Sequence, residues 1–256
     1  MKQHQETELL HHLQLKGRLE LAEVVDMLQI SESTARRLFT RLEAEGKVLR
    51  VHGGIQIPWK SPTEYSFERL VKAKVDEKNA IAEKACNLLE DGDVIFCDAG
   101  TTMLCFCMRL KQRLEQEPMK LIVFTNSLAN FEVLSPCVPI TLIGGSYREY
   151  RKDFCGYLAE LALGKVHFTK CFLGTDGCDM KNCFTTTDFD TAKLDEIAIQ
   201  NSSETVILCD SGKFGSCAQV GYAEFDAVDR VISDAGMPSA AQQLLKSHGI
   251  EVILAT

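Results

Sequence analysis

Seven short apolar runs with β-strand character, separated by helical stretches, constrain the fold of residues 94–256 more than any other feature of the sequence. Each run is followed by small or polar residues, an alternation typical of α/β domains. The expected strands are Val94–Cys97, Leu121–Phe124, Ile140–Ile143, Cys171–Leu173, Val206–Cys209, Arg230–Ile232 and a last strand near Val252. We therefore predict an α/β domain with a mostly parallel sheet.

Polar or glycine-rich segments directly follow five of these strands. They are residues 98–102 (DAGTT), 125–127 (TNS), 144–146 (GGS), 174–177 (GTDG) and 210–215 (DSGKFG). Ligands of open parallel sheets bind just beyond the carboxyl ends of the strands, so the segments predict one shared site. Any one of them could equally cap a helix or turn the chain. Their joint placement favours binding.

The chemistry of these segments fits a phosphorylated polyol. Gly100 allows close backbone approach, and Thr101 and Thr102 begin a helix whose amides can hold a phosphate. Lys213 can add a positive charge, while Asp98 and Asp176 can accept hydrogen bonds from sugar hydroxyls. The predicted effector-binding residues are Asp98, Gly100, Thr101, Thr102, Thr125, Asn126, Ser127, Gly144, Gly145, Asp176 and Lys213.

The segment from Ile30 to Gly54 predicts a helix followed by a hairpin. Ser31 can cap the helix and Gly46 can end it, and one face carries the apolar residues Ala35, Leu38, Phe39 and Leu42. The opposite face carries Ser33, Arg36, Arg37, Thr40 and Arg41. Such a face is most often only solvated.

The neighbouring segments favour nucleic-acid binding instead. A short helix over Leu21–Leu28 and a brief turn precede, and an earlier helix ends near Gly17. Val48–Val51 can pair with Ile55–Ile57 as a β-wing. We therefore predict a winged helix-turn-helix whose DNA-binding residues are Ser31, Ser33, Thr34, Arg36, Arg37, Thr40, Arg41, Arg50, His52 and Gly53.

Charge and composition agree with two domains. The chain of 256 residues carries a formal charge of −8, but residues 1–57 contain 8 Lys+Arg and 8 Asp+Glu, so DNA affinity must come from local clustering. Pro58 and Pro62 interrupt regular structure after the wing. We predict a winged helix-turn-helix domain at 1–57, a linker and lead-in at 58–75, and an effector domain at 76–256.

Targeting and redox features point to a cytoplasmic protein. The start, MKQHQETELL, lacks the apolar core of a signal peptide, and no later run is long enough to cross a bilayer. The 11 cysteines lie mostly in apolar runs and include no Cys-x-x-Cys pair, so we expect reduced core residues, no metal and no cofactor. Redox regulation through cysteine stays an alternative.

The N-terminal segment resembles the recognition region of DeoR-type bacterial transcriptional regulators, VSxxTIRRDLxxLxxxGxLxRxHGG. Ala35, Leu38 and Phe39 depart from that pattern, and Leu38 replaces the usual Asp. Since position 38 lies on the apolar stripe, we expect Leu38 to pack. The matching residues are Ile30, Ser31, Thr34, Arg36, Arg37, Leu42, Gly46, Leu49, Arg50, His52, Gly53 and Gly54.

The rest of the chain resembles the sensor domain of the same family. Residues 66–69 (SFER), Glu77-Lys78 and Ile81-Ala82 match its first segment, and the DAGTT, TNS, IGG, LGTDG and DSGKFG motifs follow. The resemblance implies a fold similar to ribose-5-phosphate isomerase A and a phosphorylated sugar as effector. Ala99 and Gly212 stand where serine-like residues are more usual, which bears on ligand specificity.

Together these features predict a DNA-binding regulator, a repressor of a carbohydrate-metabolism operon, that forms a dimer or tetramer on double-stranded operator DNA and does not associate with membranes. The alternative is a sugar-phosphate isomerase with Asp176 or Asp179 as base and Lys213 as polarising cation. The chain lacks the Lys-Gly-Gly-Gly-Gly stretch associated with that enzyme. We therefore expect binding without catalysis.

Overall fold

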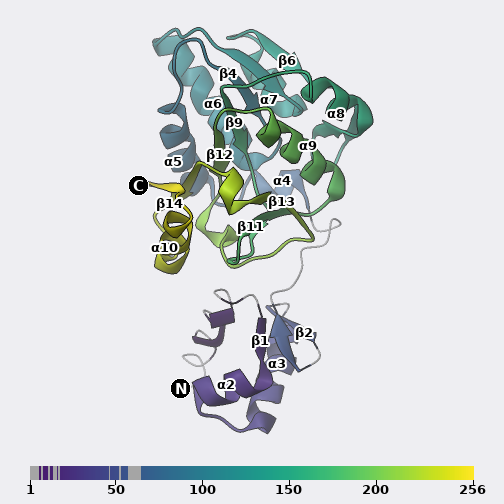
Figure 1. Ribbon diagram of the computed structural model, residues 1–256, viewed down its shortest axis with the longest axis vertical. Coiled ribbons are helices and arrows are strands. Elements are labelled where there is room, and N and C mark those ends of the chain that lie inside the picture. Colours follow the sequence, from purple (N-terminus) through teal and green to yellow (C-terminus); the bar gives the residue numbers. More distant parts are fainter. Residues whose placement is uncertain are drawn as a thin grey trace.

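The computed structural model describes residues 6, 8–10, 12, 13, 16, 18–45, 47–51, 53–56 and 65–256. Figure 1 shows an N-terminal helical module with a small sheet and a larger α/β domain. Gly17, Gly46, His52 and residues 57–64, which include the prolines of the predicted linker, lie outside the described residues. Among the residues described, no helix is long and apolar enough to cross a membrane.

The N-terminal module has the predicted winged-helix elements. Helix α2 spans Leu21–Leu28 and α3 spans Glu32–Ala44, and the side chain of Ser31 caps α3 by accepting the Thr34 N–H at 3.3 Å. Leu9 and Leu13 of the preceding helical segment pack with Ala35, Phe39 and Leu42 of α3 in one core. Leu38 is half-buried against that core, as its place on the apolar stripe predicts.

The wing is a three-stranded sheet rather than a simple hairpin. Strands β2 (Leu49–Val51) and β3 (Gly54–Gln56) pair in antiparallel fashion, and β1 (Arg18–Glu20) adds to the other side of β3. No sequence pattern predicts β1, because only one of its three side chains, that of Leu19, is buried. Glu20 then joins a capping box with Glu23 at the start of α2.

The larger domain is built on a seven-stranded parallel sheet with the order β15-β14-β12-β9-β4-β5-β6. All seven predicted strands belong to it. Their bounds are β4 Val94–Cys97, β5 Ile122–Thr125, β6 Ile140–Leu142, β9 Lys170–Leu173, β12 Thr205–Leu208, β14 Arg230–Asp234 and β15 Glu251–Ala255.

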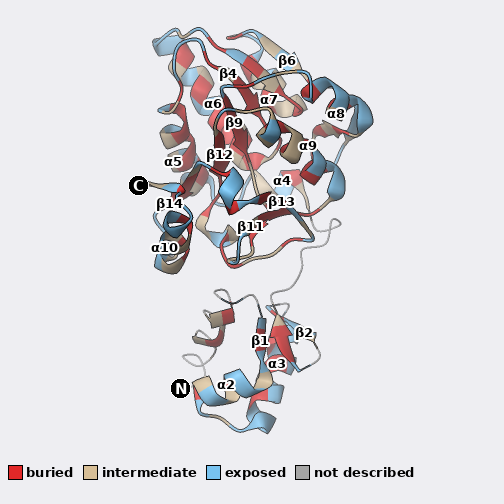
Figure 2. Cartoon of the chain, viewed as in Figure 1, coloured by how far each residue is buried: buried red, intermediate tan, exposed pale blue. Residues whose placement is uncertain are grey.

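Helices cover both faces of this sheet, and alternate residues of each strand serve the two faces. Ile95 belongs to the core that includes residues of α5, α6 and α7, whereas its neighbour Phe96 belongs to the core that includes residues of α8, α9 and α10. Figure 2 shows the buried residues concentrated along the central strands. The helices are α5 Val75–Cys86, α6 Thr101–Gln116, α7 Leu128–Leu134, α8 Tyr157–Leu163, α9 Phe189–Gln200 and α10 Ser239–Ser247.

Smaller elements complete the domain. Strands β7 (Ser146–Arg148) and β8 (Asp153–Cys155) form a hairpin, and β10 (Gly177–Cys178), β11 (Cys183–Thr186) and β13 (Val220–Glu224) form an antiparallel sheet. Short 3₁₀ turns cover Ser211–Lys213 and Phe225–Ala227. Helix α4 (Phe67–Leu70) precedes α5 and joins the larger domain through the Phe67 N–H, which donates to the Tyr150 carbonyl at 3.2 Å.

The strand order creates a switch point beside β4. From β4 the chain proceeds through β5 and β6 to one edge, while β9, β12, β14 and β15 extend the sheet in the other direction. The loops after β4 and β9 therefore diverge and leave a crevice at the carboxyl edge of the sheet.

Candidate ligand cavity and nucleic-acid interface

A cavity of about 270 Å³ occupies this crevice. Its walls come from the loops after β4, β9 and β12, from the start of α6, from α9, and from the segment before α5. The lining residues are Tyr65, Leu70, Ala73, Lys74, Lys78, Asp98, Ala99, Gly100, Thr101, Thr102, Met103, Arg151, Gly174, Thr175, Asp176, Thr186, Thr191, Asp195, Asp210, Gly212 and Lys213.

Six of the predicted effector-binding residues line the cavity and five do not. Those that line it are Asp98, Gly100, Thr101, Thr102, Asp176 and Lys213. Of the other five, Thr125 ends β5, Asn126 and Ser127 follow it, and Gly144 and Gly145 follow β6. Strands β5 and β6 lie on the far side of β4 from β9 and β12. The sequence predicts that all these loops lie at one edge of the sheet, but the order of the strands determines which loops are neighbours.

The loops after β5 and β6 have structural partners instead. Ser127 caps α7, and Asn130 links the Thr125 hydroxyl to the backbone carbonyl of Asp98. Asn126 donates to the Phe154 carbonyl at 3.2 Å. Gly144 and Gly145 lead into β7, and Gly145 lies against the backbone of Cys155. The loops after β5 and β6 thus hold the β4 loop and the β7–β8 hairpin in position.

One side of the cavity is cationic. Lys74 donates to Asp210 at 2.5 Å, and this hydrogen bond and the charge of Lys213 hold the pKa of Asp210 low, although burial opposes its ionisation. Lys78, almost fully buried, donates only to the carbonyls of Leu70 and Ala73 among the described residues. Burial lowers the pKa of Lys78. The ammonium groups of Lys78 and Lys213 thus form no ion pair with a carboxylate in the described part of the chain, although both interact with the charge of Asp210.

Helix α6 begins on the same side. Its N-cap is Gly100, whose φ of +125° is a conformation that favours glycine. No side chain caps the helix. The first N–H groups of a helix lack intrahelical partners, so the turn at Thr101 and Thr102 presents amides and hydroxyls to the cavity. This arrangement can bind an anion.

The space around Gly212 explains why this position lacks a side chain. A Cβ atom there would lie 2.7 Å from the Lys74 Nζ atom. The absence of a side chain leaves room for the Lys74–Asp210 pair at the cavity wall.

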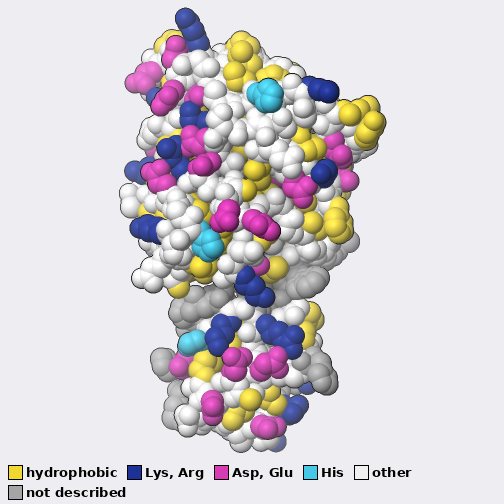
Figure 3. Space-filling view, in the orientation of Figure 1, with side chains coloured by type: hydrophobic (Ala, Val, Ile, Leu, Met, Phe, Trp, Pro, Cys, Tyr) yellow, Lys and Arg dark blue, Asp and Glu magenta, His cyan; other side chains and the backbone are white. Residues whose placement is uncertain are grey.

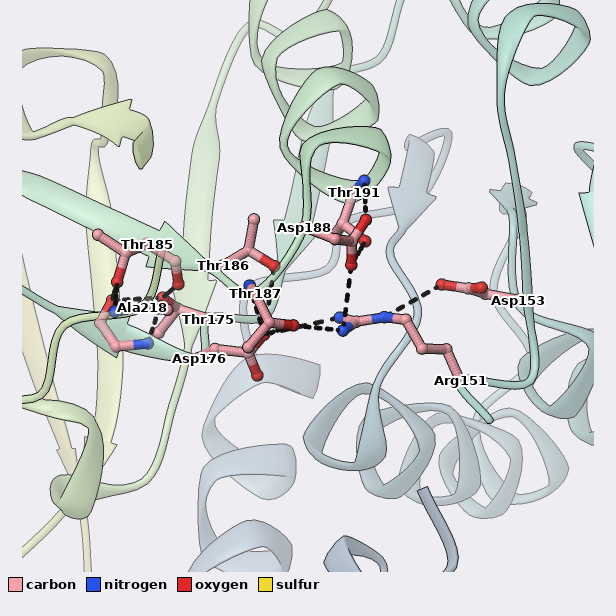
Figure 4. Close-up of polar contacts among 12 residues, drawn as sticks. Arg151, Asp153, Thr175, Asp176, Thr185, Thr186, Thr187, Asp188, Thr191 and Ala218 are labelled. Carbon is pink, nitrogen blue, oxygen red and sulfur yellow. Dashed lines mark hydrogen bonds and ion pairs between the residues drawn. The ribbon is translucent and has the colours of Figure 1, made fainter. Parts of the chain in front are cut away.

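The opposite side of the cavity is organised by Arg151. Its guanidinium lies within 3.4 to 3.7 Å of Asp188, Asp153 and Asp176, and it stacks on the Tyr65 ring with 4.0 Å to the ring centroid. Figure 4 shows Arg151 between the loop that carries Asp176 and the start of α9. The charges of these carboxylates raise the pKa of Arg151 despite its burial. Arg151 therefore stays cationic and links the β7–β8 hairpin to the loop that carries Asp176 and to the start of α9.

Two carboxyl groups of the lining have no cationic partner in the described part of the chain, those of Asp98 and Asp195. Asp98 accepts the N–H groups of Ala99 and Gly174, and burial raises the pKa of Asp98 to about 7. Asp195, on α9, is 1% exposed, and neither of its oxygens accepts a hydrogen bond from a described residue. Burial, and next the charge of Asp98, raise the pKa of Asp195 well above its usual value.

Sequence patterns did not single out several of these lining residues. Lys74 and Lys78 come from the start of α5, Arg151 from the hairpin after β7, and Asp195 from the middle of α9. No strand-end motif contains any of them. Arg151 stands near Arg148 in the polar run SYREYRKDF, which is the one signal that could have marked this segment.

The two candidate bases of the isomerase alternative, Asp176 and Asp179, both have hydrogen-bond partners within the protein. Asp176 accepts hydrogen bonds from Thr186 and Thr187 and lies 3.7 Å from Arg151. Asp179 lies outside the lining, and one of its oxygens accepts three backbone N–H groups, those of Lys181, Asn182 and Cys183.

The exposed face of α3 is the candidate nucleic-acid interface, and its arginines differ in their surroundings. Arg37 is exposed and has no ion pair among the described residues, and Arg36 lies 3.4 Å from Glu32. Arg41 instead donates to Glu6 at 2.8 Å. The same carboxylate also accepts from Lys47. Arg41 is therefore held toward the first helical segment.

The wing and α3 are joined at this face. Arg50 of β2 donates to the Thr40 hydroxyl at 3.2 Å, so it extends the exposed face of α3. Gly53 forms the turn, with φ +83°, and its carbonyl accepts the Leu21 N–H at 2.7 Å. Ser31 and Thr34 share a hydrogen bond at the start of α3, next to exposed Ser33. Figure 3 shows Lys and Arg interspersed with Asp and Glu on the visible face of this module.

The cysteines are free thiols in the structure. Eight are buried and Cys137, Cys183 and Cys217 are partly buried. Burial raises the pKa of Cys183 to about 11 and also that of Cys217, which disfavours the reactive thiolate. The described residues include no group of His, Cys, Asp and Glu that could hold a metal ion.

Comparisons with known proteins match both parts of the chain. Residues 6–60 match the DeoR-like helix-turn-helix domain, and residues 73–235 match the DeoR C-terminal sensor domain. A lactose phosphotransferase system repressor of Lactococcus lactis subsp. lactis is 34% identical over 229 residues, which cover 88% of each chain. The HTH-type transcriptional repressor GlcR of Bacillus subtilis (strain 168) is 27% identical, over 96% of this chain and 93% of GlcR.

Among solved structures, a ribose 5-phosphate isomerase A from Methanocaldococcus jannaschii matches 55% of each chain with a TM-score of 0.43 and 20% identity. The relatives in sequence are named as transcriptional regulators and not as enzymes. With the winged helix and the parallel α/β domain in place, the chain belongs to the DeoR family of DNA-binding transcriptional regulators.

Proposed function

We propose that this chain represses a carbohydrate-metabolism operon and that a phosphorylated sugar in the cavity controls its binding to operator DNA. The observation that carries the proposal is the pair of ammonium groups, Lys78 and Lys213, which form no ion pair with a carboxylate among the described residues. They line a cavity that also includes the start of α6. A phosphate dianion matches both features.

The phosphate is proposed to bind at Gly100, Thr101 and Thr102 between Lys78 and Lys213. Backbone amides at a helix start and flanking cations are the usual environment of a bound phosphate. The sugar then extends toward Asp98 and Asp176, whose carboxylates can accept hydroxyl groups. All of these residues except Lys78 belong to the effector-binding set predicted from the sequence, and all of them line the cavity.

DNA is proposed to contact the exposed face of α3 and the wing. Ser33, Arg36, Arg37 and Thr40 face away from the module's core, and Arg50 adjoins Thr40. Recognition helices of this kind lie in the major groove, where arginine can donate two hydrogen bonds to guanine. Arg41 and Ser31 have contacts within the module, so we assign them positioning roles.

Two copies of the chain are proposed to act together. Helix α8 and the start of α9 expose the apolar side chains of Tyr157, Leu158, Leu161 and Phe189, the first, second and last of these by more than two thirds. Figure 3 shows hydrophobic side chains on this flank of the larger domain. We call these four exposed side chains the apolar patch on α8 and α9. Large apolar side chains exposed on a protein surface mark an interaction site, and a second copy would bring two α3 helices to a palindromic operator.

Ligand binding is tested by calorimetry and thermal unfolding with ribose 5-phosphate, glucose 6-phosphate and galactose 6-phosphate, each beside its unphosphorylated parent sugar. At least one phosphate should bind and raise the unfolding temperature, because a ligand of the folded state stabilises it. The parent sugars should not, and no sugar should be converted. Failure of all three phosphates to bind contradicts the proposal.

Lys213→Ala locates the site. It should weaken binding of the phosphate by about tenfold or more, because a charge-assisted contact to the phosphate is lost. Lys165→Ala, which removes an exposed lysine outside the cavity, is the matched control. Equal affinities of the two variants for the sugar phosphate would place the ligand elsewhere.

A further inference from the structure

Ionisable groups of opposite sign are balanced in the cavity lining, but they are not fully paired. The lining includes four cationic side chains, Lys74, Lys78, Arg151 and Lys213, and four carboxyl groups, Asp98, Asp176, Asp195 and Asp210. Lys74 pairs with Asp210 at 2.5 Å, and Arg151 lies 3.7 Å from Asp176. This leaves two ammonium groups, which the proposed phosphate satisfies, and the carboxyl groups of Asp98 and Asp195.

The Asp195 carboxyl group is unusual because it is buried without hydrogen-bond partners among the described residues. It is 1% exposed, it lines the cavity, and neither carboxyl oxygen accepts a hydrogen bond from a described residue. A buried carboxyl group that lacks partners destabilises a folded protein, so such groups are uncommon outside sites of function. A ligand in the cavity can supply the missing donors.

The groups that surround Asp195 are mostly negatively charged. The charges that act on it are those of Asp98, Asp188 and Asp176, opposed by Arg151, and the buried Tyr222 hydroxyl is a further neighbour. Arg151 is already shared among the three carboxylates of Asp153, Asp176 and Asp188. The second guanidinium of the region, Arg148, is taken by Asp153 and Asp188. Neither guanidinium of this region is therefore left to form an ion pair with Asp98 or Asp195.

We propose that Asp195, together with Asp98, binds a protonated amine, so that the effector is an amino sugar phosphate with its amine at the α9 side of the cavity and its phosphate at the α6 side. The inference rests on the proposed function for the phosphate end. It adds a specificity-determining residue, Asp195, that no strand-end motif contains.

An ammonium group fits this end of the cavity better than a hydroxyl group. It offers three donors and a positive charge, whereas a hydroxyl offers one donor and no charge. Two adjoining buried carboxyl groups cannot both stay ionised without a cation, and burial already raises the pKa of Asp98 to about 7. An amine that binds between them favours their ionised forms and displaces a proton.

The test compares matched sugars on the full chain. Calorimetry with glucosamine 6-phosphate against glucose 6-phosphate, and galactosamine 6-phosphate against galactose 6-phosphate, changes only the group at carbon 2. In at least one pair the amine should bind more tightly by about tenfold or more. Its advantage should grow from about pH 6 to about pH 7.5, as Asp98 ionises, while the hexose phosphate serves as the control for titration of the phosphate itself.

Two variants test the assignment to Asp195. Asp195→Asn keeps the shape of the side chain and should reduce the preference for the amine by about tenfold. Glu196→Gln makes the same chemical change at the next residue of α9, where Glu196 pairs with Lys193 at the surface, and should keep the preference. Thermal unfolding checks that both variants fold, and the comparison on the unaltered chain stands without them.

The outcomes distinguish a failure of the amine site from a failure of the proposed function. If the hexose phosphates bind as tightly as the amines in both pairs, or Asp195→Asn keeps the preference, the inference is wrong while the phosphate site stands. If no sugar phosphate of either kind binds, the proposed function fails and the inference fails with it.

Discussion

Arg37 and Arg41 stand one helical turn apart on α3, yet their guanidinium groups have different surroundings. Arg37 has no ion pair among the described residues, whereas Arg41 donates to Glu6 and approaches Glu45. Periodicity assigns both to the exposed face, but it does not reveal that a carboxylate from another segment binds one of them.

Arg37→Ala should therefore weaken operator binding more than Arg41→Ala. The expected loss at Arg37 is about 1–3 kcal/mol if it donates two hydrogen bonds to a base, against less than about 1 kcal/mol at Arg41. Fluorescence anisotropy with an operator fragment selected by the unaltered protein measures both. Equal losses would show that α3 approaches DNA in another orientation.

Among the elements, the wing depends on one close backbone approach. Gly54 of β3 pairs with Glu20 of β1, and a Cβ atom on Gly54 would lie 2.0 Å from the Leu19 carbonyl oxygen. Because that oxygen belongs to the backbone, it cannot move aside as a flexible side chain could. β1 must shift if residue 54 gains a side chain.

Gly54→Ala should destabilise the N-terminal module by about 2 kcal/mol or more. Hydrogen exchange of residues 18–56, followed by mass spectrometry, should show faster exchange in β1 and β3. Gly144→Ala is the matched control, since a Cβ atom there meets nothing within 4 Å. Unchanged exchange in the Gly54 variant would contradict the close approach.

The elements also show what the sequence can and cannot predict. The strands β4, β5, β6, β9, β12, β14 and β15 of the parallel sheet read as apolar runs and were all predictable. The central strands β9 and β12 are buried on both faces, whereas the edge strands β6 and β15 are partly exposed. The short strands β1, β7, β8, β10, β11 and β13 carry few buried apolar residues or depend on distant partners, and no local pattern marks them.

The same distinction explains the site. The residues after β4, β9 and β12 meet at the cavity because those strands are neighbours, which is a property of the strand order and not of any local segment. Asp195 was not predictable for another reason. On α9 it occupies a buried position that periodicity assigns to core packing, and only the absence of hydrogen-bond partners among the described residues distinguishes it.

At the scale of the whole molecule, the apolar patch on α8 and α9 should set the oligomeric state. Leu158→Glu places a charge within the proposed contact and should convert a dimer, or a tetramer built from it, to smaller species. Light scattering coupled to size-exclusion chromatography measures this. Met108→Glu, at an exposed apolar residue of α6, is the control. If the unaltered chain is monomeric at all concentrations, the patch does not bind a second copy.

The segment between the two domains also contributes to the cavity. Tyr65, Leu70, Ala73 and Lys74 precede α5 and line the wall, where Tyr65 stacks on Arg151 and Lys74 binds Asp210. A ligand there contacts the same stretch of chain that leads back to the DNA-binding module. Its occupancy can therefore change the position of residues 65–74, which contribute to the cavity wall and follow the DNA-binding module in the sequence. In a dimer on two half-sites, the position of this segment sets the effective concentration of the second DNA-binding module once the first is bound. A ligand could then control DNA affinity without any change within α3 itself.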